Sequence, residues 1–506
     1  MTSAELIVVG AGAAGAVISA RVTERSDREV LLLEAGPDRA GDALPPDLRD
    51  GTRNSMLDHD WGYRHRPAPG AGLVPLPRGR VVGGSSAVNT CIALRGQPED
   101  YDEWAARGLP EWAWSECLSA FKRLERDLDF DGEWHGIDGP IPVRRHPASE
   151  LVPWQAAFVG AALGLGYASC ADTNDPRTTG VGPHAMNKVR GERMSAARCY
   201  LTPVVRARRG LRIRPDTLVR CVLFERRRVC GVEVETAGRV ETISSRRVVL
   251  SAGAIATPGI LLRSGVGPRA ELERLGVQQV AGVPAVGARL LDHPGTAFFL
   301  LPRAPGVGDA AHPLIQTVLR YRSEGSLFPN DMQIQAGSMI PLPRFTVPLV
   351  SLMTSVGKPR STGTLHFPSA DPHAHPRIES ALFTHADDCA RAAEALEIAW
   401  LCATSPEMRE LARPLFPDER VLSRRSELEA YVARICDSGY HPCGTVPMGA
   451  DDDATAATDG RGRVRGTDGL VVADASLFPT IPTANTHLPT LMLGERFGEW
   501  LREGSI

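Results

Sequence analysis

The start of the chain alternates between apolar runs and small residues in the pattern of a β-α-β unit. The runs at residues 6–9 (LIVV) and 30–33 (VLLL) predict two buried strands. Residues 13–23, which lie between them, are small and apolar and predict a helix that packs close to a sheet. Two strands joined by such a helix indicate an α/β fold with a parallel sheet.

Further runs extend this pattern along the chain. Apolar or alternating stretches predict strands at residues 141–143, 212–219, 221–224, 229–235, 248–250, 331–335 and 470–474. Helical spacing predicts helices within residues 102–125, at 257–263, at 387–404 and from Pro489 onward. Residues 44–77 are rich in Pro, Gly and Asp and predict an irregular crossing.

The chain of 506 residues exceeds what one hydrophobic core usually covers, so we expect two domains. The nucleotide-binding pattern occupies the start of the chain and returns near its end. We therefore assign residues 1–149, 196–295 and 441–506 to one discontinuous domain. The pattern loosens elsewhere, and we assign residues 150–195 and 296–440 to a substrate domain.

The loop after the first strand has the spacing of a dinucleotide fingerprint. Gly10, Gly12 and Gly15 allow a tight turn and a close approach to a pyrophosphate at the N-terminus of the following helix. Glu34 ends the second strand, where a carboxylate can bind a ribose diol. Tight strand-to-helix turns also use such glycines for structure alone, but the flanking strands and Glu34 favour a nucleotide site.

A second glycine-rich block covers residues 79–89, with Gly83 and Gly84 followed by two serines. Its backbone could approach a flat ring closely and donate N–H groups to it. Taken alone, this block could also be a structural turn.

Composition and charge narrow the class of protein. With 50 Gly, 40 Pro and 6% aromatic residues, the chain favours an α/β fold with many ordered loops over a helical bundle. A net charge of −3 gives no nucleic-acid-binding footprint. The ten cysteines are scattered, and no export signal or membrane-spanning run is evident, so we expect reduced thiols and a cytoplasmic location.

Two histidines near the end of the chain are the candidate chemical groups. His441 lies in SGYHPCGT and His487 in NTHLPT. A histidine base beside a redox cofactor indicates a substrate that loses a proton to the base and a hydride to the cofactor. Cys436 and Cys443 near His441 suggest zinc, but a fourth ligand is not apparent and we reject it. His135 is interpreted as a loop histidine without a catalytic role.

The ordered motifs resemble those of the glucose-methanol-choline (GMC) flavoprotein oxidoreductases. The matching blocks lie at residues 10–15 with Glu34, 79–102, 253–267, 441–449 and 472–492. The resemblance implies a mixed α/β fold in which FAD lies extended between a discontinuous Rossmann-like domain and a substrate domain built on an antiparallel sheet.

The resemblance also implies a set of FAD contacts. The glycines of the first loop would meet the pyrophosphate and Glu34 the adenosine ribose, while Val219 would touch the adenine. The complete set of expected cofactor residues is Gly10, Gly12, Ala13, Ala14, Gly15, Glu34, Ala35, Arg80, Val82, Gly84, Ser85, Asn89, Thr90, Val219, Ala252, Asp474, Ala475, His487 and Pro489.

In such proteins the histidine after a Trp or Tyr is the usual base, which implies His441 here, with His487 as its polar partner. The helix that starts at Pro489 would stabilise negative charge on reduced flavin with its positive end. Some members bond FAD to a histidine in the glycine-serine block. This chain has Val88 there, so we expect noncovalent FAD.

The resulting hypothesis is an oxidase or dehydrogenase that converts a primary or secondary alcohol to an aldehyde or ketone. Two alternatives stay open: a lyase that cleaves cyanohydrins without net redox change, and a flavin module without catalysis. The electron acceptor could be oxygen or a quinone or protein carrier. A neutral small or aryl alcohol is favoured over a choline-like cation, because Asp331 is the only acid within residues 329–340.

Overall fold

A five-stranded parallel sheet forms the centre of the nucleotide-binding half. The computed structural model describes residues 2–24, 28–55, 58–341 and 346–506. The strand order is β11 (Leu211–Arg214), β3 (Val30–Leu33), β2 (Leu6–Val9), β15 (Val248–Leu250) and β28 (Leu470–Val472), all parallel. These strands are buried apolar runs, as expected for a sheet covered on both faces. The predicted Rossmann-like sheet is confirmed.

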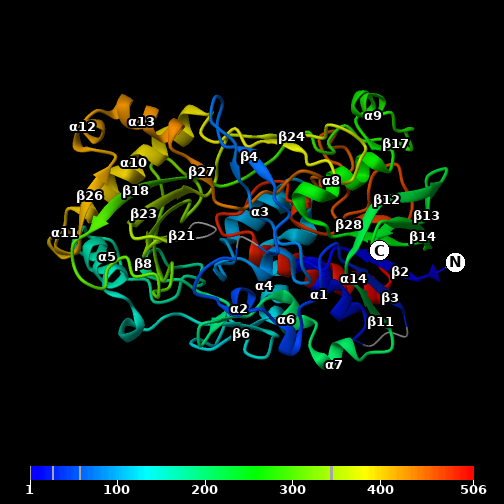
Figure 1. Cartoon of the computed structure of the whole chain (residues 1–506), viewed down its shortest axis with the longest axis horizontal. Helices are drawn as coiled ribbons and strands as arrows, with labels where there is room; N and C mark the ends of the chain where they lie inside the picture. Colours follow the sequence, from blue (N-terminus) through cyan, green and yellow to red (C-terminus); the bar gives the residue numbers. More distant parts are fainter. Residues whose placement is uncertain (1, 25–27, 56–57, 342–345) are drawn as a thin grey trace.

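Helix α14 (His487–Glu503) packs against α1 (Ala13–Val22) at very short range, on the right-hand half of Figure 1. Gly494 faces α1 so closely that a Cβ there would lie 2.9 Å from the Cβ of Val17. The buried Glu495 carboxylate accepts from the Arg21 guanidinium at 2.8 Å and from the Tyr200 hydroxyl. The first and last parts of the sequence are thereby joined into one layer.

A four-stranded sheet lies beside this layer, in the order β1 (Thr2–Ser3), β14 (Arg239–Ser244), β13 (Arg228–Thr236) and β12 (Thr217–Glu225). The predicted single strand at residues 212–219 is wrong. The chain divides there between β11 and β12, because Asp216 adopts a positive φ of 50° that breaks an extended run. The two new strands belong to different sheets.

A seven-stranded antiparallel sheet forms the other half of the molecule, at the left of Figure 1. Its main order is β26 (Ala412–Phe416), β18 (Pro294–Pro302), β23 (Val350–Val356), β20 (Met332–Gly337), β19 (Thr317–Tyr321) and β8 (Gly180–Pro183), and β27 (Asp437–Ser438) pairs with β18. Helices pack on it around a second hydrophobic core. They are α5 (Pro153–Gly164), α10 (Ala386–Ala403), α11 (Pro406–Leu411) and α13 (Arg425–Arg434).

A further small sheet crosses the predicted domain boundary. Its order is β24 (Thr364–His366), β25 (Arg377–Glu379), β4 (Arg64–Arg66) and β5 (Val74–Pro75). Strands β4 and β5 lie within the stretch 44–77, which was expected to be irregular, so that expectation is only partly right. Because β25 pairs with β4, part of the range 296–440 packs on the nucleotide-binding half, and the two-domain division stays a prediction.

The remaining elements connect these layers. The other helices are α2 (Pro46–Arg49), α3 (Pro98–Ala106), α4 (Trp114–Leu124), α6 (Ala196–Tyr200), α7 (Pro203–Arg206), α8 (Gly253–Arg263), α9 (Arg269–Leu275) and α12 (Glu419–Leu422). The other strands are β6 (Glu125–Asp127), β7 (Ile141–Val143), β9 (Lys188–Val189), β10 (Glu192–Arg193), β16 (Val266–Gly267), β17 (Ala281–Gly282), β21 (Ile340–Pro341) and β22 (Thr346–Val347).

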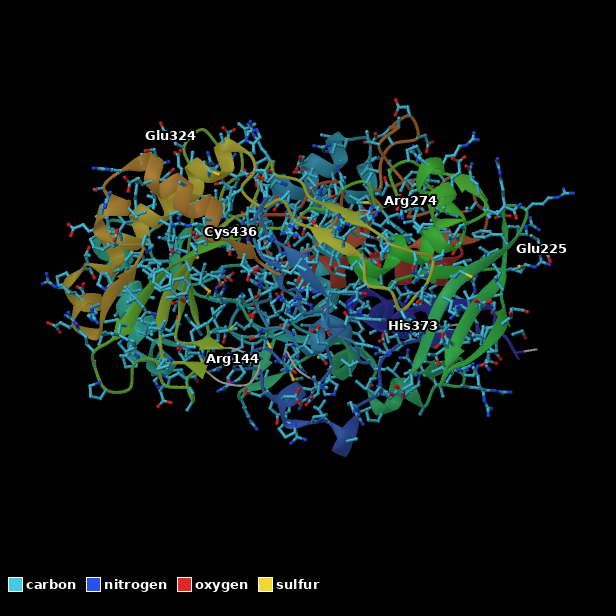
Figure 2. All side chains as sticks on the ribbon, turned by 45° about the horizontal axis from the view of Figure 1, so that its top comes forward. Arg144, Glu225, Arg274, Glu324, His373 and Cys436 are labelled. Atoms are coloured by element: carbon cyan, nitrogen blue, oxygen red, sulfur yellow. The ribbon has the colours of Figure 1, made fainter. Side chains whose placement is uncertain are left out.

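Two properties of the surface and helices follow from composition. Charged side chains lie over the outside, with Glu225 and Glu324 toward opposite ends of the molecule (Figure 2). In the part of the chain that the structure describes, none of the helices combines the length and apolar character needed to cross a bilayer.

The glycine contact between α1 and α14 predicts an asymmetric response to added methyl groups. Gly494→Ala should lower the free energy of unfolding by about 1–3 kcal/mol, since its Cβ would meet packed atoms of α1. Gly160→Ala in α5 is the matched control, because the nearest atom to its Cβ lies 3.9 Å away. It should be stabilising by about 0.5–1 kcal/mol. Thermal unfolding of both variants tests this, and equal shifts would contradict it.

Candidate active site

One cavity of about 760 Å³ extends from the parallel sheet to the antiparallel sheet. At one end it is lined by the residues that follow β2, β3, β15 and β28. Because these strands are parallel, their carboxyl ends meet at one edge, where α/β proteins bind nucleotides. At the other end it is lined by one face of β18, β20 and β23.

The loop after β2 is closely packed against neighbouring backbone, and only glycine fits at two of its positions. A Cβ on Gly10, whose φ is +96°, would lie 2.4 Å from the carbonyl oxygen of Ser251, and one on Gly15 would lie 1.9 Å from that of Gly10. These contacts bring α1 against the strand ends and leave its first residues, Ala13 and Ala14, on the cavity wall.

Glu34 lines the cavity directly after β3. Its carboxylate accepts from the N–H groups of Ala11 and Gly36, each at 2.9 Å. Burial raises its pKa to about 7, against the opposing effect of these N–H donors. The carboxylate is therefore fixed in position beside the glycine loop and can accept further hydrogen bonds from a ligand.

The second glycine block lies directly against the first. Gly84 has a φ of +51°, and a Cβ on it would lie 2.8 Å from the Cα of Gly12. Ser85, Asn89 and Thr90 follow on the cavity wall. A cavity wall that continues from the first glycine loop in this way suits a planar ring attached to the nucleotide.

Asp474 joins the loops after β15 and β28. Its Oδ2 accepts from the N–H of Gly253 at 2.8 Å and from the hydroxyl of Thr257 at 2.6 Å, both in α8. Its Oδ1 accepts from the N–H of Ser476 at 2.8 Å. Asp474 therefore has a structural task in addition to its position on the cavity wall.

The structure brings most of the expected cofactor residues to this one cavity. The ones that line it are Gly10, Gly12, Ala13, Ala14, Glu34, Ala35, Gly84, Ser85, Asn89, Thr90, Val219, Ala252, Asp474, Ala475 and His487. Four expected residues do not line it, namely Gly15, Arg80, Val82 and Pro489. The Arg80 guanidinium lies 5.1 Å from the centre of the Trp61 ring, and Pro489 is buried within α14.

At the other end of the cavity, β18 and β27 place two histidines side by side. Pro294 pairs with Ser438, so His293 directly precedes one strand while His441 follows the other. The buried Asp292 carboxylate accepts from the N–H of His293 at 2.8 Å and of His441 at 3.0 Å, and from the Ser438 hydroxyl. Burial raises the pKa of Asp292 to about 6.

The His441 imidazole has a hydrogen-bond partner at each ring nitrogen. Its Nδ1 lies 2.9 Å from Nδ1 of His293, and its Nε2 lies 2.9 Å from Nδ2 of Asn485. Burial lowers its pKa well below the usual value, and electrostatic interactions with His293 and Arg78 lower it further. His441 is therefore a neutral imidazole at pH 7, which is the protonation state of a general base.

His487 lines the same cavity but has a different environment. It is the first residue of α14, so this helix begins two residues before the expected start at Pro489. Its Nε2 is buried without a partner among the described residues, and burial lowers its pKa to about 4. The structure thus places Asn485, and not His487, in hydrogen bond with the His441 ring.

Sequence reasoning missed His293 and Asn485. Asn485 lies in the same motif as His487, two residues earlier, and the expected partner type of Asn or His fits both residues. The motif alone could not separate them, because the choice depends on how the chain enters α14. For His293 the sequence holds no local signal, since its contact with His441 spans 148 residues.

The part of the cavity wall on the antiparallel sheet carries neutral side chains. Gln333 and Gln335 of β20, Met353 of β23 and Phe299 of β18 line it. The Gln333 amide donates to the carbonyl of Thr483 at 3.1 Å, which leaves its oxygen oriented by the Gln335 amide at 3.3 Å. Such a wall suits a neutral substrate with polar substituents.

Asp437 is a carboxylate on this side of the cavity that lies partly in solvent. Its side chain is 49% exposed, and its Oδ1 lies 3.1 Å from Nε2 of the fully buried His65. His65 also lies 2.8 Å from the Ser380 hydroxyl. Asp437 is thus held on the cavity wall by a buried histidine.

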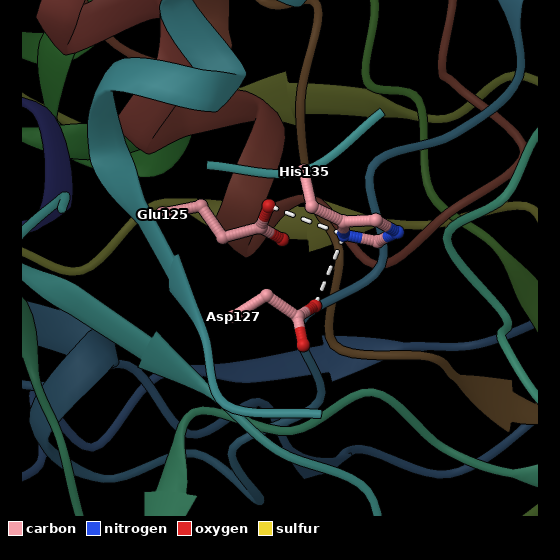
Figure 3. Close-up of side chains that lie close together, drawn as sticks. All are labelled: Glu125, Asp127 and His135. Atoms are coloured by element: carbon pink, nitrogen blue, oxygen red, sulfur yellow. Dashed lines mark ion pairs between the residues drawn. The ribbon is translucent and has the colours of Figure 1, made fainter. Parts of the chain in front are cut away.

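A separate cluster of Glu125, Asp127 and His135 has the spacing of metal ligands (Figure 3). Two buried guanidinium groups already neutralise its carboxylates: Arg95 pairs with Glu125, and Arg145 pairs with Asp127 at 2.6 Å. Although burial lowers the pKa of His135, carboxylates led by that of Asp127 raise it to about 10. The cluster is therefore a closed ion-pair network, and His135 carries a proton in it.

Comparison with known proteins agrees with this geometry. The GMC oxidoreductase family matches residues 4–295 with its N-terminal part and residues 359–494 with its C-terminal part. The chain is 34% identical to 5-(hydroxymethyl)furfural oxidase of Methylovorus sp. (strain MP688) over 526 residues, which cover 98% of each protein. It is 30% identical to oxygen-dependent choline dehydrogenase of Sinorhizobium fredii, over 97% of this chain and 94% of that protein.

A solved structure gives the same result. The crystal structure of pyridoxine 4-oxidase from Mesorbium loti superimposes with a TM-score of 0.90 at 28% sequence identity and covers 99% of both chains. The expected fold, a Rossmann-like FAD domain with a second substrate-binding part, is confirmed by this likeness.

The contact between Gly84 and Gly12 predicts that an added methyl group displaces FAD. Gly84→Ala should yield protein with little bound flavin, because its Cβ would push the two loops apart. Gly276→Ala is the control: Gly276 also has a positive φ, of +68°, but no atom of the described residues lies within 4 Å of its Cβ. It should lose about 1 kcal/mol of stability and keep FAD.

Flavin content is measured in the supernatant after acid precipitation. Val88 has no nucleophilic side chain, so we expect all flavin of the unmodified protein to be released. Flavin that stays in the pellet would contradict noncovalent binding, and a full flavin load in Gly84→Ala would contradict the contact argument.

The ion-pair network predicts a stability that depends on pH. His135→Gln should lower the free energy of unfolding by about 3 kcal/mol at neutral pH, since the three buried carboxylates of Glu125, Asp127 and Asp172 would then face only the two guanidinium groups of Arg95 and Arg145. The His135 pKa is raised to about 10 from about 6.5, so its contribution is complete below pH 6.5 and is lost as the pH rises through 10.

Urea unfolding at pH 6.5 and pH 10 measures this, and the difference between the two proteins should shrink at the higher pH. His373→Gln is the control, because His373 is 58% exposed where it pairs with Glu235 and should change stability by less than about 0.5 kcal/mol. A difference that is constant with pH would contradict a charged His135.

Proposed function

The chain belongs to the GMC oxidoreductase family and is an FAD-dependent oxidoreductase that acts on alcohols, and we propose that His441 is its catalytic base. The observation that carries this proposal is the environment of His441: a neutral, half-buried imidazole on the cavity wall, fixed at both ring nitrogens. An alcohol gives up hydride readily only as its oxygen becomes an alkoxide, so a base must take the hydroxyl proton.

Bound FAD would supply the acceptor for the hydride that leaves the alcohol carbon. The chain's own residues do the rest: Gly10, Gly12 and Gly84 let the backbone approach this group, and Glu34 fixes its nucleotide end. Asn485 donates to Nε2 of His441 at 2.9 Å and would donate to a substrate oxygen that enters beside this nitrogen. The alcohol would then be held between an acceptor and a donor.

His487 has a supporting role in this proposal. It stands at the N-terminus of α14, a helix of 17 residues whose positive end faces the cavity. Negative charge that develops near this end would be stabilised by the unpaired N–H groups of the first turn. The pKa of His487 is lowered to about 4, which keeps its ring neutral. His487 therefore acts as a hydrogen-bonding group and not as a cation.

For the substrate we propose a neutral primary alcohol on a small aromatic or heteroaromatic ring. The neutral wall of Gln333, Gln335 and Met353 supports this class, as does the similarity to 5-(hydroxymethyl)furfural oxidase and pyridoxine 4-oxidase. An amino alcohol is the second candidate, favoured by the partly exposed Asp437 carboxylate on the cavity wall and by the similarity to choline dehydrogenases. The comparisons give no support to a lyase or to a silent flavin module.

Removing the base predicts a loss of turnover without loss of the cofactor. His441→Gln should lower kcat by about 10²–10⁴-fold, the usual contribution of a general base, and should keep FAD. His373→Gln on the surface should leave kcat unchanged. The measurement is anaerobic flavin reduction with furfuryl, benzyl and amino alcohols, followed by admission of air.

Flavin bleaching with the aryl alcohols at higher kcat/KM than with choline would support the substrate proposal. Fast recolouring in air with release of peroxide marks an oxidase, and slow recolouring marks a dehydrogenase. Full activity of His441→Gln would contradict His441 as base, and no bleaching by any alcohol would contradict the substrate class.

A further inference from the structure

The hydrogen bonds of His293 determine which of its ring nitrogens carries the proton. Its Nε2 lies 2.9 Å from the carbonyl oxygen of Pro482 and 3.1 Å from that of Gly357. Both partners are carbonyl oxygens, which only accept, so Nε2 of His293 must carry the hydrogen. Burial lowers the pKa of His293 to about 4, and the neutral ring therefore has a lone pair at Nδ1.

This lone pair faces Nδ1 of His441 at 2.9 Å. Two ring nitrogens at this distance share one hydrogen, and His293 cannot supply it. We propose that His293 is a positioning residue that holds the hydrogen of His441 on Nδ1 and so leaves Nε2 of His441 as the basic nitrogen in the cavity. This inference deepens the proposed function of His441 and rests on it.

The opposite end of the His441 ring agrees with this assignment. The Asn485 amide nitrogen lies 2.9 Å from Nε2 of His441, and an amide N–H can bond only to a nitrogen that has a lone pair. The chain of donors thus runs in one direction, from Asn485 to His441 and from His441 to His293, and then to two backbone carbonyls. All four contacts are satisfied when His441 carries its hydrogen on Nδ1 and His293 carries its hydrogen on Nε2.

Gly439 makes the close approach of the two rings possible. A Cβ at this position would lie 2.9 Å from Nδ1 of His441 and 3.2 Å from Cβ of His293. The ring planes meet at 78°, with centroids 5.0 Å apart, which directs one nitrogen of each ring at the other. The rings are therefore held by the backbone and not only by their own hydrogen bond.

The charged groups around the pair do not reverse the assignment. Arg78 and Lys358 disfavour a second proton on His441 and His293 respectively. Asp292 accepts from the backbone N–H groups of both histidines, and Asp100 acts on His293 from a distance. His487, on α14, is neutral, and among the described residues no carboxylate is bonded to either ring.

The direct test is nitrogen NMR of the resting holoenzyme with ¹⁵N-labelled histidine. We expect a protonated shift for Nδ1 and a lone-pair shift for Nε2 of His441, assigned by the loss of its signals in His441→Gln. This readout needs no turnover, so it stands apart from the proposed function. A protonated Nε2 in the resting enzyme would overturn the inference, whereas full activity of His441→Gln would overturn only the role of His441.

Variants of His293 provide the second readout. His293→Leu removes the acceptor, and kcat should fall by about tenfold or more with little change in KM, while the acidic limb of the pH profile moves. His293→Asn places an amide oxygen near the position of Nδ1. It should therefore recover part of the kcat that His293→Leu loses and should keep the His441 tautomer. Gly439→Ala keeps His293 but separates the rings, and should reproduce the defect of His293→Leu.

If His293→Leu does not fold, the labelled unmodified enzyme and His293→Asn still decide the question. An unchanged His441 tautomer together with an unchanged pH profile in folded Gly439→Ala, whose added Cβ separates the two rings, would contradict the inference. The same unchanged result in a folded His293→Leu would show that His293 has no positioning role.

Discussion

The buried carboxylate of Asp292 is the interaction on which the catalytic end depends. It accepts from the N–H groups of His293 and His441 and from the Ser438 hydroxyl, and so joins segments 149 residues apart. The antiparallel pairing of β18 with β27 brings these segments together, and the carboxylate then fixes their exact approach at the strand ends. A buried charge is stable only with such donors, which explains why three of them converge on it.

Helix α14 connects this end of the cavity to the nucleotide end. Asn485 and His487 lie at its start, while Gly494 packs on α1, the helix that follows the first glycine loop. A shift of α14 along α1 would therefore move the partner of the base and the wall of the cofactor cavity together. The short distance at Gly494 opposes such a shift, because packed backbone leaves little freedom to slide.

The parts predicted from the sequence are those set by local contacts. The strands β2, β3 and β15 and the glycine loop follow from apolar runs and from spacings within about thirty residues. The features that were not predicted depend on contacts between distant parts of the chain or on the backbone conformation where a helix or strand begins. The pairing of β4 with β25 has no local pattern, and Asp216 divides a run that reads as one strand. The hydrogen bond of Asn485 to His441 was not predicted, whereas the role of His487 as the second polar group stays a prediction.

A histidine partner affects the pKa of His441 differently from a carboxylate partner. A carboxylate would raise the pKa of His441 and favour its protonated form, whereas neutral His293 accepts a hydrogen without adding charge. His441 thus stays neutral, and burial and Arg78 make its protonated form costly. The proton taken from an alcohol would be held only briefly in such a site. The neighbours of His441 therefore favour a base that is unprotonated at neutral pH over one that is already protonated.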